Sequence, residues 1–213
     1  MKTDDLVAML ASGPTAVPRR AAARRIELAL LAGLPLSAAI VLFGYGVRPD
    51  LLQAMFWPMF WMKLLFPLCI AVAAFVVAQR VARPGVRVRG AWLGIALPVL
   101  ALWVLAAISW FAAPAGERMP LLMGETWQMC LVSIGAIALP LFVAALAAMK
   151  SLAPTRPALA GAAVGGLAGG AGAALYALHC TELTAPFLAV WYVAGIALPV
   201  VVGALIGPRL LRW

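Results

Sequence analysis

Two cysteines and the sole histidine are the residues whose types could carry chemistry in this sequence. Cys180 follows His179 directly, Glu182 is two residues further on, and Cys130 lies well before them. Thiolate and imidazole are ligands that Cu(I) and Zn(II) prefer, and two neighbouring thiols can be oxidised to a disulfide. We therefore expect a signal-sensing site at Cys130, Cys180, His179 and Glu182, with Cys130, Cys180 and His179 as candidate metal ligands. A simpler interpretation stays open, in which the thiols are isolated, because adjacent helix residues do not face each other.

Lys63 is the second unusual residue, because it lies inside a long apolar stretch. A charge within a membrane helix costs at least ~2.5 kcal/mol on insertion scales, so its ammonium needs a partner or water. One interpretation is a structural ion pair with Glu125, Glu182 or Asp50. In the other, the positive charge stabilises a thiolate at one of the two cysteines and makes Lys63 part of the signal-sensing site.

The elements that must position these residues are apolar helices. The chain has 213 residues, of which 66% are hydrophobic and 11% charged, with a mean hydropathy of +1.05. This composition predicts an all-α, polytopic membrane protein, because ~20 apolar residues span a bilayer as a helix and a β-barrel would show alternating polarity. The six predicted spans are Ile26 to Val47, Leu51 to Ala78, Ala91 to Ala112, Met129 to Ala148, Ala158 to Leu178 and Leu188 to Pro208.

The basic residues predict how these spans are oriented. Thirteen of the sixteen precede the first span, lie between the second and third or the fourth and fifth, or follow the sixth. The positive-inside rule then places both termini in the cytoplasm, which makes the net charge of +9 a matter of topology and lipid contact rather than of nucleic-acid binding. Cys130 and Cys180 both fall at outer ends, and the short connection between the fourth and fifth spans makes those helices antiparallel neighbours.

Residues 1–25 form a cytoplasmic N-terminal segment, separate from the bundle of residues 26–213. Thr3 can cap a short helix whose first turn carries Asp4 and Asp5, and Leu6, Met9 and Leu10 follow at helical spacing. A helix this short is unstable alone in water. It is either a tail or surface helix, or a segment that binds a partner through Thr3, Asp4, Asp5, Leu6, Met9 and Leu10.

Glycines recur every four residues in the fifth span, at Gly161, Gly165 and Gly169. Small residues at this spacing let helices approach closely. This predicts the most tightly packed helix of the bundle and offers a contact for a homo-oligomer.

Several stretches together resemble the NrsF family of membrane anti-sigma factors over essentially the whole chain. They are the start Met1 to Leu6, Phe60 to Leu64, Trp127 to Cys130, and His179 to Glu182 with Trp191 and Tyr192. The resemblance implies a bacterial inner-membrane protein, not an enzyme, that holds an extracytoplasmic-function sigma factor through its N-terminal segment. It also implies that Cys130 and Cys180 take part in the response to a stress signal.

Combined with the ligand types, this predicts release of the sigma factor on a metal or redox signal, with a regulatory Cu or Zn ion and no obligatory cofactor. The alternative is a small transporter with Lys63 and Glu182 along its path. An enzyme is disfavoured: a thiol oxidase needs a second cysteine pair to pass electrons on, which Cys69 alone does not supply.

Overall fold

The protein is an all-helical bundle, described here from a computed structural model that covers residues 2–12, 20–83, 85, 86, 88 and 90–212. Within these residues six helices are long and apolar enough to cross a membrane. They comprise α2 with its extension η1 (Ala21–Ala39 and Ile40–Tyr45), α4 (Pro58–Val81), α5 (Leu93–Ala112), α7 (Trp127–Lys150), α8 (Pro157–Tyr176), and α9, η2 and α10 in succession (Ala185–Phe187, Leu188–Tyr192 and Val193–Leu210). The predicted fold class is confirmed.

The described residues also contain the short helices α1 (Thr3–Ala11), α3 (Leu51–Ala54) and α6 (Arg118–Met123), of which α6 leads into the fourth span. The second span was predicted to start at Leu51, but α3 ends after one turn and α4 starts at Pro58. The reason is Pro58 itself, which disfavours helical geometry at the residue before it; Trp57 is extended, with φ −91° and ψ 124°. Pro58 then suits the first position of α4.

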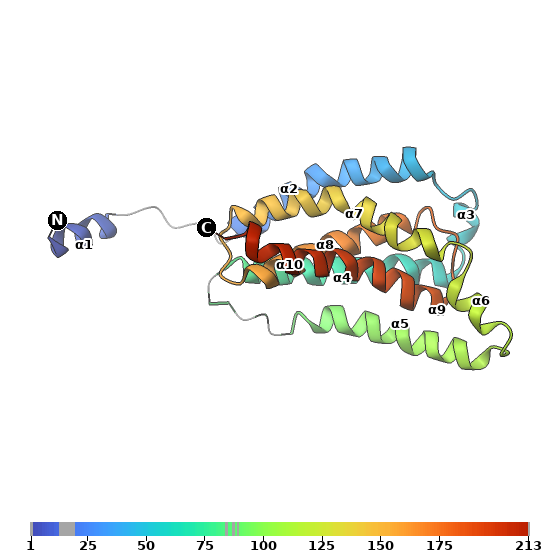
Figure 1. Cartoon of the computed structure of the whole chain (residues 1–213). Coiled ribbons are helices and arrows are strands. Elements are labelled where there is room, and N and C mark those ends of the chain that lie inside the picture. Colours follow the sequence, from blue (N-terminus) through green and yellow to red (C-terminus); the bar gives the residue numbers. More distant parts are fainter. Residues whose placement is uncertain (1, 13–19, 84, 87, 89, 213) are drawn as a thin grey trace.

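Helix α8 lies at the centre of the bundle, between α4, α7 and α10 (Figure 1). It is 72% buried, the highest share among the six spans, which confirms that the glycine-rich helix is the most tightly packed. A Cβ atom at Gly161 would collide with the carbonyl oxygen of Gly203, and one at Gly165 with the carbonyl oxygen of Pro199. These glycines pack against α10 of the same chain. Their faces of α8 are therefore covered and are not free to contact a second copy of the protein.

Two helices contain π-helical segments that the sequence did not predict. η1 ends the first span, and η2 joins α9 to α10. A π turn inserts an extra residue into the helix and rotates the side chains that follow it. In η2 this segment carries Tyr192, which is fully buried.

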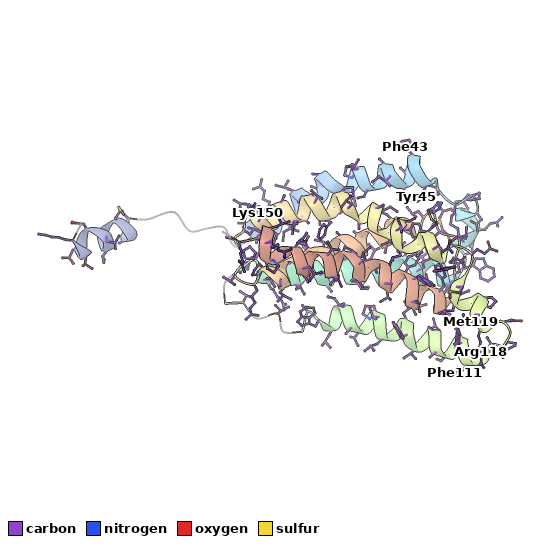
Figure 2. All side chains as sticks on the ribbon, viewed as in Figure 1. Phe43, Tyr45, Phe111, Arg118, Met119 and Lys150 are labelled. Atoms are coloured by element: carbon purple, nitrogen blue, oxygen red, sulfur yellow. The ribbon has the colours of Figure 1, made fainter. Side chains whose placement is uncertain are left out.

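The bundle has two chemically different ends. We call the end formed by residues 45–58, 113–129 and 177–185 the thiol end, and the end formed by residues 20–25, 80–83, 150–156 and 209–212 the arginine end. Figure 2 shows Lys150 at the arginine end and Tyr45, Phe111 and Arg118 at the opposite end. Helix α1 and the C-terminus lie on the arginine side (Figure 1).

Candidate functional site

The two thiols expected to act together lie in one buried cluster at the thiol end. Cys130 is in the first turn of α7, and Cys180 follows α8 by four residues. Their exposed fractions are 0% and 3%, and both pack in the hydrophobic cluster that contains Tyr176 and Tyr192. Both are free thiols. Cys69, in contrast, is exposed on the outside of the bundle.

The segment that carries Cys180, residues 180–184, is not helical, and two of its carbonyl groups are bound by a side chain. Cys180 still donates its N–H to Tyr176 O at 3.0 Å. The carbonyls of Cys180 and Glu182 are bound instead by Lys63, whose Nζ lies 2.6 Å and 2.7 Å from the two oxygens. Two strong hydrogen bonds therefore connect α4 to this segment.

The expected ion pair between Lys63 and a carboxylate is wrong. The Lys63 side chain is fully buried, and its Nζ donates to the backbone oxygens of Cys180 and Glu182. A Glu182 carboxylate oxygen accepts from the backbone N–H of Glu125 at 2.7 Å, and Asp50 pairs with Arg48. The cause is the irregular 180–184 segment, which offers unpaired carbonyls deep enough for Lys63 to reach. Being closed off from water, Lys63 does not line an aqueous path as a transporter would require.

Arg48 is a site residue that sequence reasoning missed. It is 5% exposed and donates from Nη1 to the carbonyl oxygen of Cys180 at 3.2 Å, so two cations converge on this one peptide group. Its backbone N–H also donates to Leu178 O at 3.0 Å. The sequence Arg48-Pro49-Asp50 could have indicated it, because a carboxylate two residues away can bind the guanidinium through two hydrogen bonds.

The fork between Arg48 and Asp50 orients the guanidinium. Nε lies 2.8 Å from Oδ1 and Nη2 lies 2.7 Å from Oδ2. These hydrogen bonds, with the charge of Arg48, hold the pKa of the Asp50 carboxyl below its usual value of 3.8. In the same way, the hydrogen bonds to Asp50 raise the pKa of Arg48. The pair therefore stays charged at neutral pH, and leaves the remaining guanidinium nitrogen for Cys180.

His179 lies near the thiols in sequence but is engaged elsewhere. Its Nδ1 is 2.9 Å from Gly46 O, so this nitrogen carries the proton. Its ring packs against Tyr45 and Tyr176, with centroids 5.3 Å and 5.7 Å away. No three His, Cys, Asp or Glu side chains gather as a metal site among the residues that the structure describes. The structure thus places the two thiols in the same buried cluster, while the His179 ring is hydrogen-bonded to Gly46.

Glu182 fixes the neighbouring turn between α6 and α7. A Cβ atom on Gly124 would lie only 2.7 Å from the Glu182 carboxylate, which is too close for any side chain. Gly124 also has a φ of +55°, in the left-handed region. Only glycine meets both demands. Thr184 adds a second contact, donating from Oγ1 to Leu121 O at 2.8 Å.

Tyr192 and Ser133 complete the cluster, and neither was predicted. The Lys63 Nζ lies 5.3 Å from the centre of the Tyr192 ring, a cation–π contact. Ser133 is three residues after Cys130, on the same face of α7. Within the described part of the chain, both hydroxyl groups are buried and neither makes a hydrogen bond of good geometry. The surroundings of the thiols are therefore rich in donors: one ammonium and two hydroxyls.

At the arginine end, a second contact joins the first span to the turn after α7. Arg25 donates from Nη1 to the backbone oxygen and the hydroxyl of Ser151, at 2.9 Å and 3.0 Å. Between the ends, α2 packs along α7, and a Cβ at Gly33 would lie 3.0 Å from the Leu141 Cα. Helix α7, which carries Cys130, therefore packs along the length of α2.

The expected partner-binding residues lie on α1. Thr3 is the first residue of the helix rather than its cap, since Asp5 accepts the N–H of Lys2 at 3.2 Å and so fills the capping role. Asp4 also lies in the first turn. Leu6, Val7 and Met9 are 39%, 58% and 60% exposed. The side chain of Leu10 lies outside the described residues. The described apolar side chains of α1 are thus not buried by the bundle.

The fold and this site define a multi-span helical protein of the membrane type, with a buried thiol pair at one end. The chain belongs to the NrsF family, since a sequence model described as "Negative regulator of sigma F" matches residues 10–213. It is 43% identical over 213 residues to the probable anti-sigma-F factor NrsF of Azospira oryzae, and 39% identical over 216 residues to the anti-sigma-F factor NrsF of Caulobacter vibrioides. Each match covers 100% of both chains.

No solved structure gives a significant match to this chain. Membership of the family makes the protein a negative regulator of a sigma factor, a regulatory protein rather than an enzyme.

Proposed function

We propose that this anti-sigma factor works in the bacterial inner membrane, with both termini in the cytoplasm. It sequesters an extracytoplasmic-function sigma factor through residues 1–25 and releases it when Cys130 and Cys180 change state. The observation that carries the release step is the double contact on Cys180, whose peptide oxygen is bound by Lys63 and by Arg48. A change at the Cys180 thiol therefore acts directly on α4 and on the segment that follows the first span.

The N-terminal segment is the sigma-binding element in this proposal. Leu6, Val7 and Met9 are exposed on a nine-residue helix, which is too short to be stable alone. Docking these side chains in an apolar groove of the sigma factor would stabilise the helix and bury them together. Asp4 and Asp5 would complement basic residues at the edge of such a groove.

Two chemical changes fit the thiol pair. A soft cation such as Cu(I), or Zn(II), can bind both sulfurs as thiolates, with their two protons released to water. Alternatively an external oxidant takes two electrons from the thiols, which lose two protons and form one S–S bond. Either change draws two residues together, one on α7 and one on the 180–184 segment, and the surrounding donors can stabilise developing negative charge on sulfur.

Helix α7 is the route by which this change reaches the arginine end. It carries Cys130 at one end and contacts Arg25 through Ser151 just after the other. Arg25 lies in the first turns of α2 and is the last residue of the N-terminal segment. A coupling of ~1–3 kcal/mol between the two ends would change the sigma affinity by roughly 5- to 150-fold.

The test uses the full-length protein in detergent-solubilised membranes with its sigma factor. Deleting residues 2–16 should abolish co-purification of the sigma factor. A Cys130→Ser, Cys180→Ser variant should still bind the sigma factor but no longer release it when Cu(I) or a thiol oxidant is added. Cys69→Ser is the matched control and should release normally. Normal release from the double variant would overturn the sensing role, and binding by the truncated protein would overturn the role of the N-terminal segment.

A further inference from the structure

A cavity of about 230 Å³ lies between α4, α5, α8 and α10, and two of its lining residues, Ile70 and Ile196, also belong to the hydrophobic cluster that contains the thiols. Ile70, Ala74 and Val77 of α4 form one wall, and Trp92 and Ile95 at the start of α5 face them across it. Figure 1 shows α5 on the outside of the bundle. Only Leu102 and Ala106 of α5 are buried. Its first turn contacts α4, where Gly94 lies against Ala73, and the cavity lies beside this contact.

The lining of this cavity is apolar throughout. Its side chains are aliphatic apart from Trp92, so a water molecule inside would lack the two to four polar partners it needs. An apolar cavity of about 150 Å³ already stays dry and accepts an apolar ligand. The position of the walls, inside four membrane-spanning helices, means that the neighbouring medium is hydrocarbon.

The size of the cavity selects its occupant. A helix of a partner protein is about 10 Å across with its side chains and is too wide for this space, whereas an alkyl chain is one methylene wide. Gly166 preserves the opening, because a Cβ there would lie 3.2 Å from the Ala74 Cβ and 3.7 Å from a Val200 methyl. Any larger residue would fill the space.

Two arginines lie beyond the cavity, on or just before helices that line it, on the side of the arginine end. Arg80 is three residues after Val77 on α4, one helical turn further along the same face. Arg156 precedes α8 and is seven residues before Ala163, which also lines the cavity. A guanidinium has five N–H donors and binds phosphate through two of them, so Arg80 can bind a phosphate while it keeps its other contacts. Trp92, 49% exposed, is suited to the interface between headgroups and chains.

We propose that this cavity binds one acyl chain of an anionic glycerophospholipid from the leaflet at the arginine end, with the lipid phosphate bound by Arg80 and Arg156. Basic groups between membrane helices recognise anionic headgroups in this way. The bound chain fills the gap between α5 and the rest of the bundle. The lipid is thereby a structural ligand of the regulator, distinct from the signal at the thiols.

Native mass spectrometry of the full-length protein tests this proposal. Delipidated protein in detergent is supplied with phosphatidylglycerol or with phosphatidylethanolamine carrying the same chains. The intact protein should retain one phosphatidylglycerol in preference to phosphatidylethanolamine. Ala197→Phe, which fills the cavity from an exposed position on α10, should abolish retention of both lipids. Ala101→Phe, on an exposed part of α5 away from the cavity lining, is the matched control.

A separate variant tests the contact between the two arginines and the lipid headgroup. Replacing Arg80 and Arg156 by Gln should lower the preference for phosphatidylglycerol by roughly fivefold for each arginine without removing the chain. Lys150→Gln, at the same end but on α7, should leave the preference unchanged. Equal retention by Ala197→Phe and its control would overturn the chain site, and an unchanged preference after the arginine substitutions would overturn the phosphate contact. A mass of two protein chains without bound lipid would overturn the proposal, because a second copy of the protein would then cover this surface.

Discussion

The ammonium of Lys63, in the middle of an apolar helix, lies 2.6 Å from the peptide oxygen of Cys180. This hydrogen bond connects the one charged residue within α4's apolar stretch to one of the two thiols at the end of the bundle. The bond to the peptide oxygen positions the segment that carries the thiol, and the ammonium also lies close enough to interact with the Cys180 side chain. It gives Lys63 a structural role that is independent of which signal the thiols receive.

Replacing Lys63 by Met should loosen the segment around Cys180. The substitution leaves the Glu182 carbonyl without its donor and the Cys180 carbonyl with Arg48 alone, and an unpaired buried carbonyl costs about 1–3 kcal/mol. In a Cys69→Ser, Cys130→Ser background, labelling of Cys180 by N-ethylmaleimide should become faster by about tenfold or more. Lys150→Met is the control for losing a cation elsewhere. An unchanged labelling rate would show that Arg48 holds the segment by itself.

The Arg48 and Asp50 pair predicts a defined pH dependence. Because the pKa of Asp50 is lowered in the folded protein, the unfolded chain binds the proton more readily. The stabilisation is therefore fully present above the unfolded pKa, near 3.8, and is lost as the pH falls through the lower, folded value. Melting temperatures of the intact protein and of Asp50→Asn should differ by a constant amount from neutral pH to about pH 5. They should converge under strongly acidic conditions; a difference that instead grew on acidification would contradict the pair.

Tyr192→Phe should leave the protein equally stable or make it more stable. The hydroxyl is buried and makes no hydrogen bond of good geometry in the described structure, and burying an unpaired hydroxyl costs about 1–3 kcal/mol in proteins. The ring keeps its contacts with Lys63 and Tyr176. Thermal unfolding in detergent measures the change, with Tyr45→Phe as a control at the same end. A clear loss of stability in Tyr192→Phe alone would mean that the hydroxyl is hydrogen-bonded, with the Cys180 thiol as its partner.

The features that could be predicted from the sequence are those set by long runs of residues. Six spans follow from hydropathy, and the placement of Cys130 and Cys180 at the same end of the bundle follows from antiparallel neighbours. What could not be predicted depends on irregular backbone. The partners of Lys63 are carbonyls freed where α8 ends, Tyr192 is turned inward by a π segment, and Arg48 reaches Cys180 from a loop whose course no periodicity reveals. Each is a contact between backbone and side chain across elements, which residue types alone do not specify.

Gly165→Ala should destabilise the bundle far more than Gly135→Ala. At Gly165 the added methyl would collide with the carbonyl of Pro199, which belongs to the backbone of α10 and cannot move alone. Overpacking of this kind costs about 1–3 kcal/mol or more. At Gly135 the nearest atom is a methyl of Leu198 at 3.3 Å, which is the end of a flexible side chain. Comparing the two melting temperatures tests whether α8 and α10 meet backbone to backbone, and equal values would rule this out.

Substitutions at the contact between Arg25 and Ser151 test whether α7 transmits the signal, separately from any effect on the stability of the fold. It is exposed, so removing it should change the free energy of unfolding by less than about 1 kcal/mol. If α7 transmits a change at Cys130 to the first span through this contact, Arg25→Gln and Ser151→Ala should each reduce release of the sigma factor while leaving its resting affinity unchanged. The double variant should be no worse than Arg25→Gln alone, because Arg25→Gln removes both hydrogen bonds whereas Ser151→Ala removes only the one to the hydroxyl. Arg24→Gln, one residue away, is the control. Additive losses in the double variant would mean that the two residues act by separate routes.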